Sequence, residues 1–412
     1  MNRIILLCLS LLWTATAIPV DAQVAGDRAT DRRPDDYRSR NFLIHTDLAK
    51  DDAEELLQKM ETMLQIISRY WGAPSRKVIE CYVIDDIKLW PPRSLPNEAV
   101  NAVNGGGLTI ARGMRRGNQL NMNAIVYASN RFGTPQHEAV HAYCYQTFSS
   151  TGPTWYAEGM AELGNYWIEN DSTVTAPDYV IRYLTQSDRK TLAEITDNQQ
   201  QTGDGWRNYA WRWALCHFLV NNGNFHDRFR TVGVGYLTGK PASFERAFET
   251  QMEELDFEFQ FFIDHLEQGF DVHRCAWDWK AKFREQKGTR PVVAKVKADK
   301  GWQSSGLKVI SGQTYQLTAR GAWKTADNAE EVSVGGDAAG SGSLLGTIYH
   351  DHQLSREFEL GGKQTFTATA TGNLMLRCRD EWNQLNDNKG TISVEFLSAS
   401  DEAAIPARRA SE

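Results

Sequence analysis

The sequence predicts an α+β protein in which a domain of small mixed sheet and helices precedes an all-β sandwich. Three observations predict this class. Strand-like and helix-like apolar spacings alternate at first, a mostly helical stretch follows, and short alternating strands with Gly, Asn and Asp turns make up the last hundred or so residues. The chain has 412 residues, of which 41% are hydrophobic, which suits two folded domains. The expected organisation is a signal peptide (1–22), a flexible leader (23–40), a first domain (41–279), a charged linker (280–291), a sandwich (292–397) and a flexible tail (398–412).

The N-terminal segment has the pattern of a secretory signal peptide. A positive charge at Arg3 precedes the apolar run Ile4–Trp13, and small residues follow, with cleavage expected after Ala22 or Ala17. The apolar run is too short to span a membrane, and no later run approaches the roughly 18 apolar residues that a span needs. We therefore expect a protein that is exported, to the periplasm or the extracellular space.

The elements of the first domain can be placed in order from their apolar spacing. We expect a strand (Asn41–Thr46), an amphipathic helix (Asp51–Tyr70), a strand (Val78–Ile84), a turn or close backbone approach (Gly105–Gly107), a strand (Leu108–Ala111), a solvated hairpin turn (Arg112–Arg116) and a strand (Ala124–Ala128). The last of these strands leads directly into the segment that carries the most informative motif.

That motif is His137-Glu-Ala-Val-His141. Four residues of α-helix turn by about 400°, so both imidazoles project from one face and can hold one Zn²⁺. Glu138 lies on an adjoining face, where its carboxylate can take the proton from an attacking water. Thr134 is expected to cap the helix, and Pro135 suits its first position.

A second helix is expected to begin near Pro153. It places Glu158 and Glu162 on one face at i, i+4, which suits a third metal ligand and an acceptor for the second nitrogen of a ligand imidazole. The sequence therefore predicts a zinc site of His137, His141 and Glu158. Two alternatives remain open: a solvated helix with two surface histidines, and a metal-free relic of a peptidase.

The segments HEAVH and PTWYAEGMAE resemble the gluzincin metallopeptidases, and above all their aminopeptidase branch, in which the third-ligand glutamate precedes a glycine as Glu158 does here. No segment matches the motif with which that branch captures a substrate amine, so an endopeptidase is expected. The chain is also similar to uncharacterised secreted bacterial proteins with a gluzincin core. The resemblance implies that the backbone at Gly106, Gly107 and Leu108 contacts a peptide substrate.

Helical spacing returns after the predicted ligands, over Trp206–Val220, Phe244–Met252 and Glu254–Leu266. By the same resemblance, a tyrosine beyond the third ligand stabilises the oxyanion, and we expect Tyr209 to do so. His217 is the second candidate, and packing is the alternative role of both residues.

The cysteines leave their pairing open. Five lie beyond the predicted signal peptide, and an odd number in an oxidising compartment leaves at least one free thiol. Cys144 and Cys216 both lie on predicted helices, so a disulfide between them and two buried free thiols are both compatible with the sequence.

The segment LMLRCRDEWNQLNDNKGTISVEF, within the predicted sandwich, resembles the end of calcium-dependent galactose-binding bacterial lectins. The resemblance implies Ca²⁺ ligands at Asp380, Asp387 and Asn388, with a backbone carbonyl from Gln384. The segment 334–343 has no equivalent of the histidine and glutamine with which those lectins hold sugar. An Asn/Asp-rich turn without an ion is the alternative.

The expected function is that of an exported zinc-dependent peptidase acting on peptides or proteins, with an accessory sandwich that binds Ca²⁺ and carbohydrate. A net charge of −7 argues against a nucleic-acid partner. The alternative is a catalytically inactive surface or carbohydrate-binding protein that retains a structural zinc site.

Overall fold

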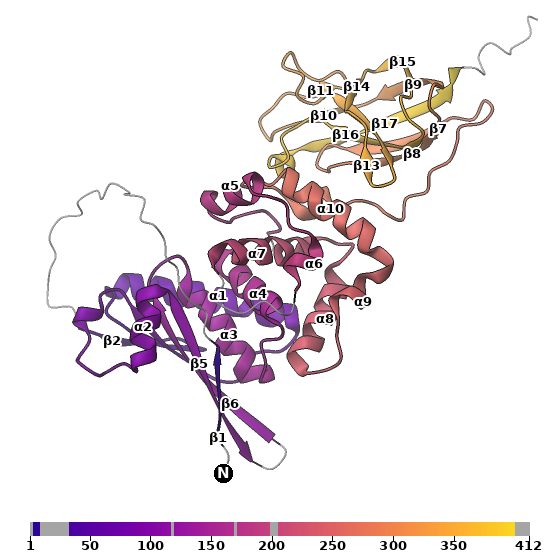
Figure 1. Cartoon of the computed structure of the whole chain (residues 1–412). Coiled ribbons are helices and arrows are strands. Elements are labelled where there is room, and N and C mark those ends of the chain that lie inside the picture. Colours follow the sequence, from indigo (N-terminus) through magenta and orange to yellow (C-terminus); the bar gives the residue numbers. More distant parts are fainter. Residues whose placement is uncertain (1–2, 9–32, 117–118, 169–170, 198–204, 400–412) are drawn as a thin grey trace, which may run out of the picture. The chain divides into compact units, whose positions relative to one another are not determined.

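The computed structural model describes residues 3–8, 33–116, 119–168, 171–197 and 205–399. The described residues form helices and several sheets, so the α+β class is confirmed at this level (Figure 1). The chain divides into two compact units, and the segments of the two units alternate along the sequence. The first comprises Met1–Asp171, Ala176–Val220 and Phe225–Thr250, and the second comprises Ser172–Thr175, Asn221–Asn224 and Gln251–Glu412.

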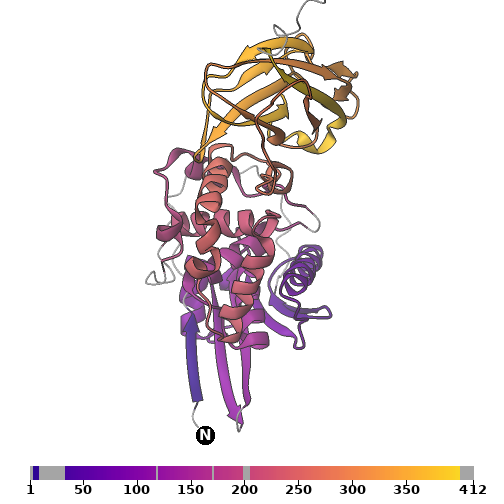
Figure 2. The same cartoon turned by 90° about the vertical axis from the view of Figure 1, so that its right-hand side faces the viewer.

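The first unit is built on one mixed sheet of strand order β1-β5-β6-β4-β3-β2. Of its four inner strands, β3, β4 and β6 are parallel, whereas β5 pairs with β6 as a long antiparallel hairpin that extends beyond the helices in Figures 1 and 2. The strands are β1 (Arg3–Cys8), β2 (Asp35–Arg38), β3 (Phe42–Thr46), β4 (Ile79–Ile84), β5 (Gly107–Arg116) and β6 (Gln119–Ser129).

The alternation of side chains along β5 separates two layers of helices. Leu108 and Ile110 join a core cluster with Ala99 and Val103 of α2 (Asn97–Gly105). Thr109, between them, faces the other side and contacts α3 (Thr134–Phe148), which packs on the sheet beside α1 (Lys50–Trp71). The sheet therefore presents every second residue of β5 to the helix that carries the HExxH motif.

Part of the predicted flexible leader is ordered, so that prediction is wrong for residues 35–40. Asp35–Arg38 pairs with β3 as the antiparallel edge strand β2. The following turn is held by the carboxylate of Glu61, which accepts hydrogen bonds from Ser39 Oγ at 2.6 Å and from the backbone N–H of Asn41 at 2.7 Å. A polar segment can form such a strand because backbone pairing does not require apolar side chains.

Two strand boundaries also differ from the prediction. Arg112–Arg116 belongs to β5, pairing with residues 119–123, so the predicted hairpin turn at these arginines is wrong. Arg3–Cys8, within the predicted signal peptide, pairs antiparallel with Thr109–Met114 of β5. Cleavage of the signal peptide stays a prediction, and the small residues before its expected site lie outside the described residues.

Helices complete the first unit around an aromatic core. Tyr156 of α4 contacts Phe229 of α8 edge to face, and Trp155 contacts Phe244 of α9 in the same way and Phe229 at a tilted angle. The predicted helix Phe244–Met252 is interrupted: α9 ends at Phe248 and a 3-10 turn follows. The helices are α4 (Thr154–Tyr166), α5 (Asp178–Gln186), α6 (Leu192–Ile195), α7 (Trp206–Asn221), α8 (His226–Thr238) and α9 (Phe244–Phe248).

The second unit contains α10 (Met252–Asp264), α11 (Val272–Cys275) and two antiparallel sheets. One sheet has the order β11-β10-β17-β9-β15 with β7 on β17, and the other has β13-β12-β16-β8 with β14 on β12. Their inner faces share one apolar core, as a sandwich requires. The strands are β7 (Val292–Lys297), β8 (Gln303–Val309), β9 (Thr314–Arg320), β10 (Ala322–Lys324), β11 (Val332–Ser333), β12 (Leu344–His350), β13 (Gln353–Leu354), β14 (Phe358–Leu360), β15 (Lys363–Thr367), β16 (Gly372–Cys378) and β17 (Lys389–Ser398).

The cysteine pairing is settled for the side chains that the structure describes. Cys144 and Cys216 are both buried and both free, so the structure has two free thiols where the sequence left a disulfide open.

Over the described ranges, no helix is long and apolar enough to cross a membrane.

Candidate metal centre

Helix α3 presents the HExxH motif from a tightly turned N-terminus. Gly133 occupies the cap position in the left-handed region, with φ 69°, and Thr134 is already helical, so the predicted Thr134 cap is wrong. The Thr134 hydroxyl instead donates to the carbonyl of Arg131 at 2.6 Å. A left-handed cap favours glycine, which explains the residue found there.

Helix α4 brings the third acidic group to the same place. Its N-cap position is Pro153, as the sequence indicated, and Glu158 is 1% exposed. The glycine that follows Glu158 is needed for packing, because a Cβ on Gly159 would lie 2.5 Å from Cys216 Sγ and 2.7 Å from the carbonyl oxygen of Arg212. Glu158 thus supplies a buried carboxylate, and Gly159 lets α7 pack closely against α4.

His137, His141 and Glu158 converge on one point. His137 Nε2 lies 3.2 Å from His141 Nε2 and 3.2 Å from Glu158 Oε2, and His141 Nε2 lies 3.4 Å from the same carboxylate oxygen. All three side chains are buried. Among the described residues, this is the cluster of His, Cys, Asp and Glu side chains that can hold a metal ion.

The separations of these atoms fit Zn²⁺. Tetrahedral ligands with bonds of about 2.0–2.2 Å lie about 3.3–3.6 Å apart, close to the three distances in the structure. Two imidazoles and a carboxylate are also ordinary zinc donors, and three protein ligands leave a fourth position open. The residues present therefore fit zinc in both chemistry and spacing.

Glu162 lies behind this cluster. Its Oε1 is 3.1 Å from Nδ1 of His137, on the opposite side of the ring from Glu158. Burial works to lower the pKa of His137, but hydrogen bonds to Glu158 and Glu162 outweigh it and hold that pKa well above its usual range. Burial likewise opposes ionisation of Glu158, yet His141 and His137 hold its pKa well below the usual range. The arrangement thus holds the ring of His137 in one orientation.

Glu138 is positioned by β5. Its carboxylate Oε2 accepts a hydrogen bond from Thr109 Oγ1 at 2.8 Å, and the same hydroxyl lies 2.9 Å from its backbone carbonyl. Gly107 makes room for it, because a Cβ there would meet Glu138 Cγ at 2.7 Å and Thr134 Cγ2 at 2.5 Å. Glu138 is 1% exposed, so this hydroxyl is an important orienting partner.

The other predicted site residues lie around the cluster. The ring of Tyr209 is 6.0 Å from the ring of His137, centre to centre, and the guanidinium of Arg212 lies over the Tyr209 ring at 5.5 Å. His217 packs against Trp213, with ring centres 5.3 Å apart. Gly106, at φ 145°, leads into Gly107 and Leu108, which lie beyond the part of β5 that β1 covers.

The predicted calcium ligands form a polar cluster in the second unit. Asp380 Oδ2, Asp387 Oδ1 and Asn388 Oδ1 are buried and have no hydrogen-bond partner among the described residues. Burial, and then the nearby charge of Asp387, raise the pKa of Asp380. Gln384 precedes the 3-10 turn Leu385–Asp387. Three inward oxygens without a donor suit a bound cation.

Sequence reasoning missed Thr109, Asp47 and Ser129. Thr109 could have been found, because alternation places it on the same face of β5 as Gly107. Asp47 accepts hydrogen bonds from the N–H groups of Asp85 and Asp86, and from Trp90 Nε1, and nothing local in the sequence indicates these partners.

The comparisons with known proteins add little to this geometry. The sequence matches no protein-family model and no curated protein. Among solved structures, the chain is similar to one described as the EclA N-terminal domain, a PllA-like lectin, at 19% identity and a TM-score of 0.21, over 26% of this chain and 94% of that one. The function proposed below therefore rests on the site's own residues and their distances.

Proposed function

We propose that the protein is a zinc-dependent peptidase of the gluzincin type. The observation that carries this proposal is the tetrahedral spacing of His137 Nε2, His141 Nε2 and Glu158 Oε2, beside a buried Glu138 that is not one of the three. A structural zinc site normally has four protein ligands. Three ligands with an adjacent general base favour catalysis over a purely structural role.

Each residue has a defined task in this proposal. Zinc supplies Lewis acidity, which polarises the scissile carbonyl and lowers the pKa of water at the site. Glu138, held by Thr109, takes the proton from the attacking water and delivers it to the leaving amine. Glu162 keeps His137 oriented, and Tyr209 donates a hydrogen bond to the oxyanion.

The test of this function is the Glu138→Gln variant. We expect it to retain one zinc per chain while hydrolysis of a mixed-sequence peptide library, followed by mass spectrometry, falls by about 10²–10⁴-fold. The Glu98→Gln variant is a matched control, because Glu98 is an exposed carboxylate on α2. Turnover by Glu138→Gln at the wild-type rate contradicts the mechanism. Zinc binding without cleavage by the wild type supports the alternative of an inactive binding protein.

We infer a second, separate activity for the sandwich: calcium-dependent carbohydrate binding. The buried, unpartnered oxygens of Asp380, Asp387 and Asn388 support the ion. Asp380 also lines a cavity of about 410 Å³ together with Trp382 and Glu357, which offers an aromatic face and charged groups to a sugar. A glycan array with Ca²⁺ and with EGTA tests this inference, and binding in neither condition contradicts it.

A further inference from the structure

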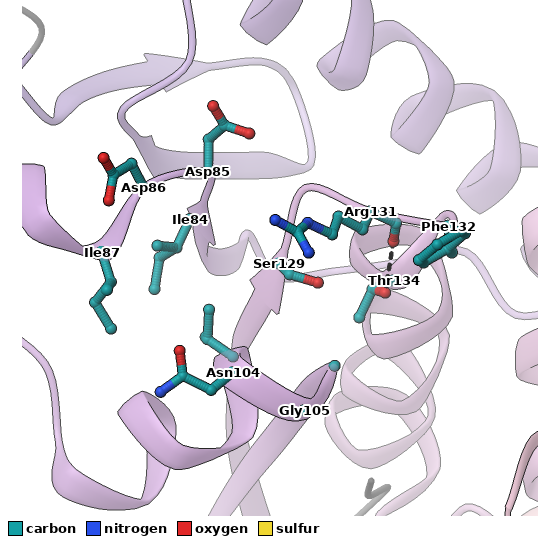
Figure 3. A pocket seen from close by; sticks show the side chains of 12 residues that line it. Ile84, Asp85, Asp86, Ile87, Asn104, Gly105, Ser129, Arg131, Phe132 and Thr134 are labelled. Carbon is teal, nitrogen blue, oxygen red and sulfur yellow. Dashed lines mark hydrogen bonds between the residues drawn. The ribbon is translucent and has the colours of Figure 1, made fainter. Parts of the chain in front are cut away.

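The first unit has a cavity close to the candidate metal centre. It occupies about 340 Å³ between the ends of β4 and β6, the end of α2 and the start of α3 (Figure 3). Gly105 and Gly106 form part of its wall, and the next residue, Gly107, lies against Glu138. The cavity wall therefore lies one to two residues along β5 and its preceding turn from Gly107, the residue that contacts the proposed general base.

The cavity has a rigid apolar side. Ile84, Ile87 and Val103 line it, and the turn that carries Ile87 is held from behind by the buried carboxylate of Asp47. The carboxylate of Asp47 accepts hydrogen bonds from the N–H groups of Asp85, at 2.9 Å, and Asp86, at 2.7 Å. Both of its oxygens therefore hold this turn. Packing and hydrogen bonds thus preform this wall before any ligand arrives.

The opposite side offers donors. Arg131 extends over the cavity in Figure 3, and it makes no ion pair with any described residue. Ser129 is 8% exposed, and its hydroxyl also has no hydrogen-bond partner in the described part of the chain. The start of α3 lies on the same side, but it adds few donors, because the N–H of Thr134 donates to the carbonyl of Arg131, Pro135 has no N–H, and the N–H of His137 donates to the carbonyl of Gly133. A guanidinium and a hydroxyl that line the same side of the cavity favour an anion.

The direction of β5 decides which part of a peptide reaches these donors. β5 runs from Gly107, beside Glu138, toward the hairpin end at Arg116. Both β6 and β1 pair with β5 antiparallel, and Cys8 at the end of β1 lies opposite Thr109. Because β1 covers Thr109–Met114, only Gly107 and Leu108 leave this edge of β5 open to a peptide. A peptide that pairs there in the same sense has its C-terminal end nearest Gly106 and the cavity.

We propose that this cavity binds a carboxylate on the C-terminal side of the cleaved bond, through Arg131 and Ser129. The inference rests on the proposed peptidase function and assigns it a substrate class: peptides that end close to the cleaved bond, or that carry Asp or Glu there. Asp85 and Asp86 also line the cavity, and because their carboxylates repel an anion, we place the carboxylate of the substrate beside Arg131. The free C-terminus and the acidic side chain share one chemistry and are separated by experiment.

The test compares matched peptides based on one library sequence that the wild type cleaves. One pair differs only in a free or amidated C-terminus, and a second amidated pair differs only in Glu or Gln after the cleaved bond. We expect kcat/KM to be about tenfold higher for the carboxylate member of one pair. This ratio corresponds to the free energy that a hydrogen bond to a charged group contributes. Arg131→Gln and Ser129→Ala should reduce that ratio toward one, whereas Arg182→Gln, at an exposed arginine of α5, should leave it unchanged.

Binding gives a second readout that does not depend on turnover. The same peptides, carrying a fluorescent label, are titrated with the Glu138→Gln variant and followed by fluorescence anisotropy. The dissociation constants should show the same preference for the carboxylate member and the same dependence on Arg131. Cleavage without a carboxylate preference in either pair, or a preference that Arg131→Gln leaves intact, overturns the assignment of the cavity alone. Failure of the wild type to cleave any peptide overturns the peptidase function and this inference with it.

Discussion

The hydroxyl of Thr109 lies 2.8 Å from the carboxylate of Glu138 and 2.9 Å from the backbone carbonyl of the same residue. One strand residue thus contacts both the side chain and the main chain of the proposed general base. Because Thr109 is fully buried and β-branched, its rotamer is narrowly restricted. The sheet, and not only the helix, therefore sets where the carboxylate points.

Replacing Thr109 by valine should lower kcat while zinc content stays at one per chain. Valine keeps the shape but removes the donor, and a hydrogen bond to a charged group contributes roughly 1.5–3 kcal/mol, so a fall of about tenfold or more is expected. Steady-state kinetics on a cleaved library peptide measure it. Thr62→Val on the exposed face of α1 is the control. An unchanged kcat in a zinc-loaded Thr109→Val protein would show that the contact does not orient Glu138.

Zinc affinity should separate the two glutamates of α4. Glu158→Gln removes a ligand and should lose stoichiometric zinc, whereas Glu162→Gln removes only the partner of His137 Nδ1 and should weaken binding by about 10–100-fold. Competition with a chromophoric chelator measures both affinities. Equal affinities in the two variants would place Glu162 on a par with Glu158 and contradict the assigned roles.

Calcium should stabilise the sandwich through Asp387. In wild-type protein, Ca²⁺ at about one hundred times its dissociation constant should add about 2.7 kcal/mol to the free energy of unfolding, and Asp387→Ala should abolish the gain. Without Ca²⁺, the same variant should be slightly more stable, because the charge of Asp387 opposes ionisation of Asp380. Thermal unfolding with Ca²⁺ or EGTA measures both effects, with Glu330→Ala at an exposed position as control. A calcium response that survives in Asp387→Ala would rule out this cluster.

The second unit should lose stability as the pH rises through neutrality, because of Glu258. Burial raises the pKa of this carboxyl to about 7, against a usual 4.5, although Asn222 and Asn224 donate to it. Between these values, the folded protein keeps a proton that the unfolded chain releases. The stabilising contribution is thus complete below pH 4.5 and lost through pH 7, amounting to about 3 kcal/mol at 1.36 kcal/mol per pKa unit.

Urea unfolding of the wild type and of Glu258→Gln at several values between pH 5 and pH 8 measures this effect. The wild-type free energy of unfolding should fall relative to that of the variant over this interval. Two curves that run parallel across the interval would show that Glu258 has an ordinary pKa.

The convergence of His137, His141 and Glu158 could be predicted because its geometry is local. His137 and His141 share a helix face by spacing alone, and the Glu158-Gly159 pair indicates its own helix with a close neighbour. Interactions between distant segments could not be predicted in the same way. The pairing of β2 with β3 depends on a partner strand, not on apolar spacing, and Asp47 acts on a turn that only the fold brings to it.

Local rules also fail where two residues compete for one role. Thr134 has the side chain of a helix cap, but Gly133 reaches the left-handed backbone that the turn requires and begins the helix one residue earlier. The sequence alone does not tell which geometry the preceding strand imposes.

The five cysteines whose side chains the structure describes are all free and buried, so we expect these five to be unreactive toward thiol reagents in the folded protein. Burial raises the pKa of Cys81, Cys144, Cys216 and Cys275 above the usual range, and that of Cys378 to about 12, so almost no thiolate exists at neutral pH. Each thiol therefore reacts only when its own region opens. Because the first unit holds Cys81, Cys144 and Cys216 and the second holds the other two, timed alkylation read by mass spectrometry reports the opening rate of each unit separately in one unlabelled sample.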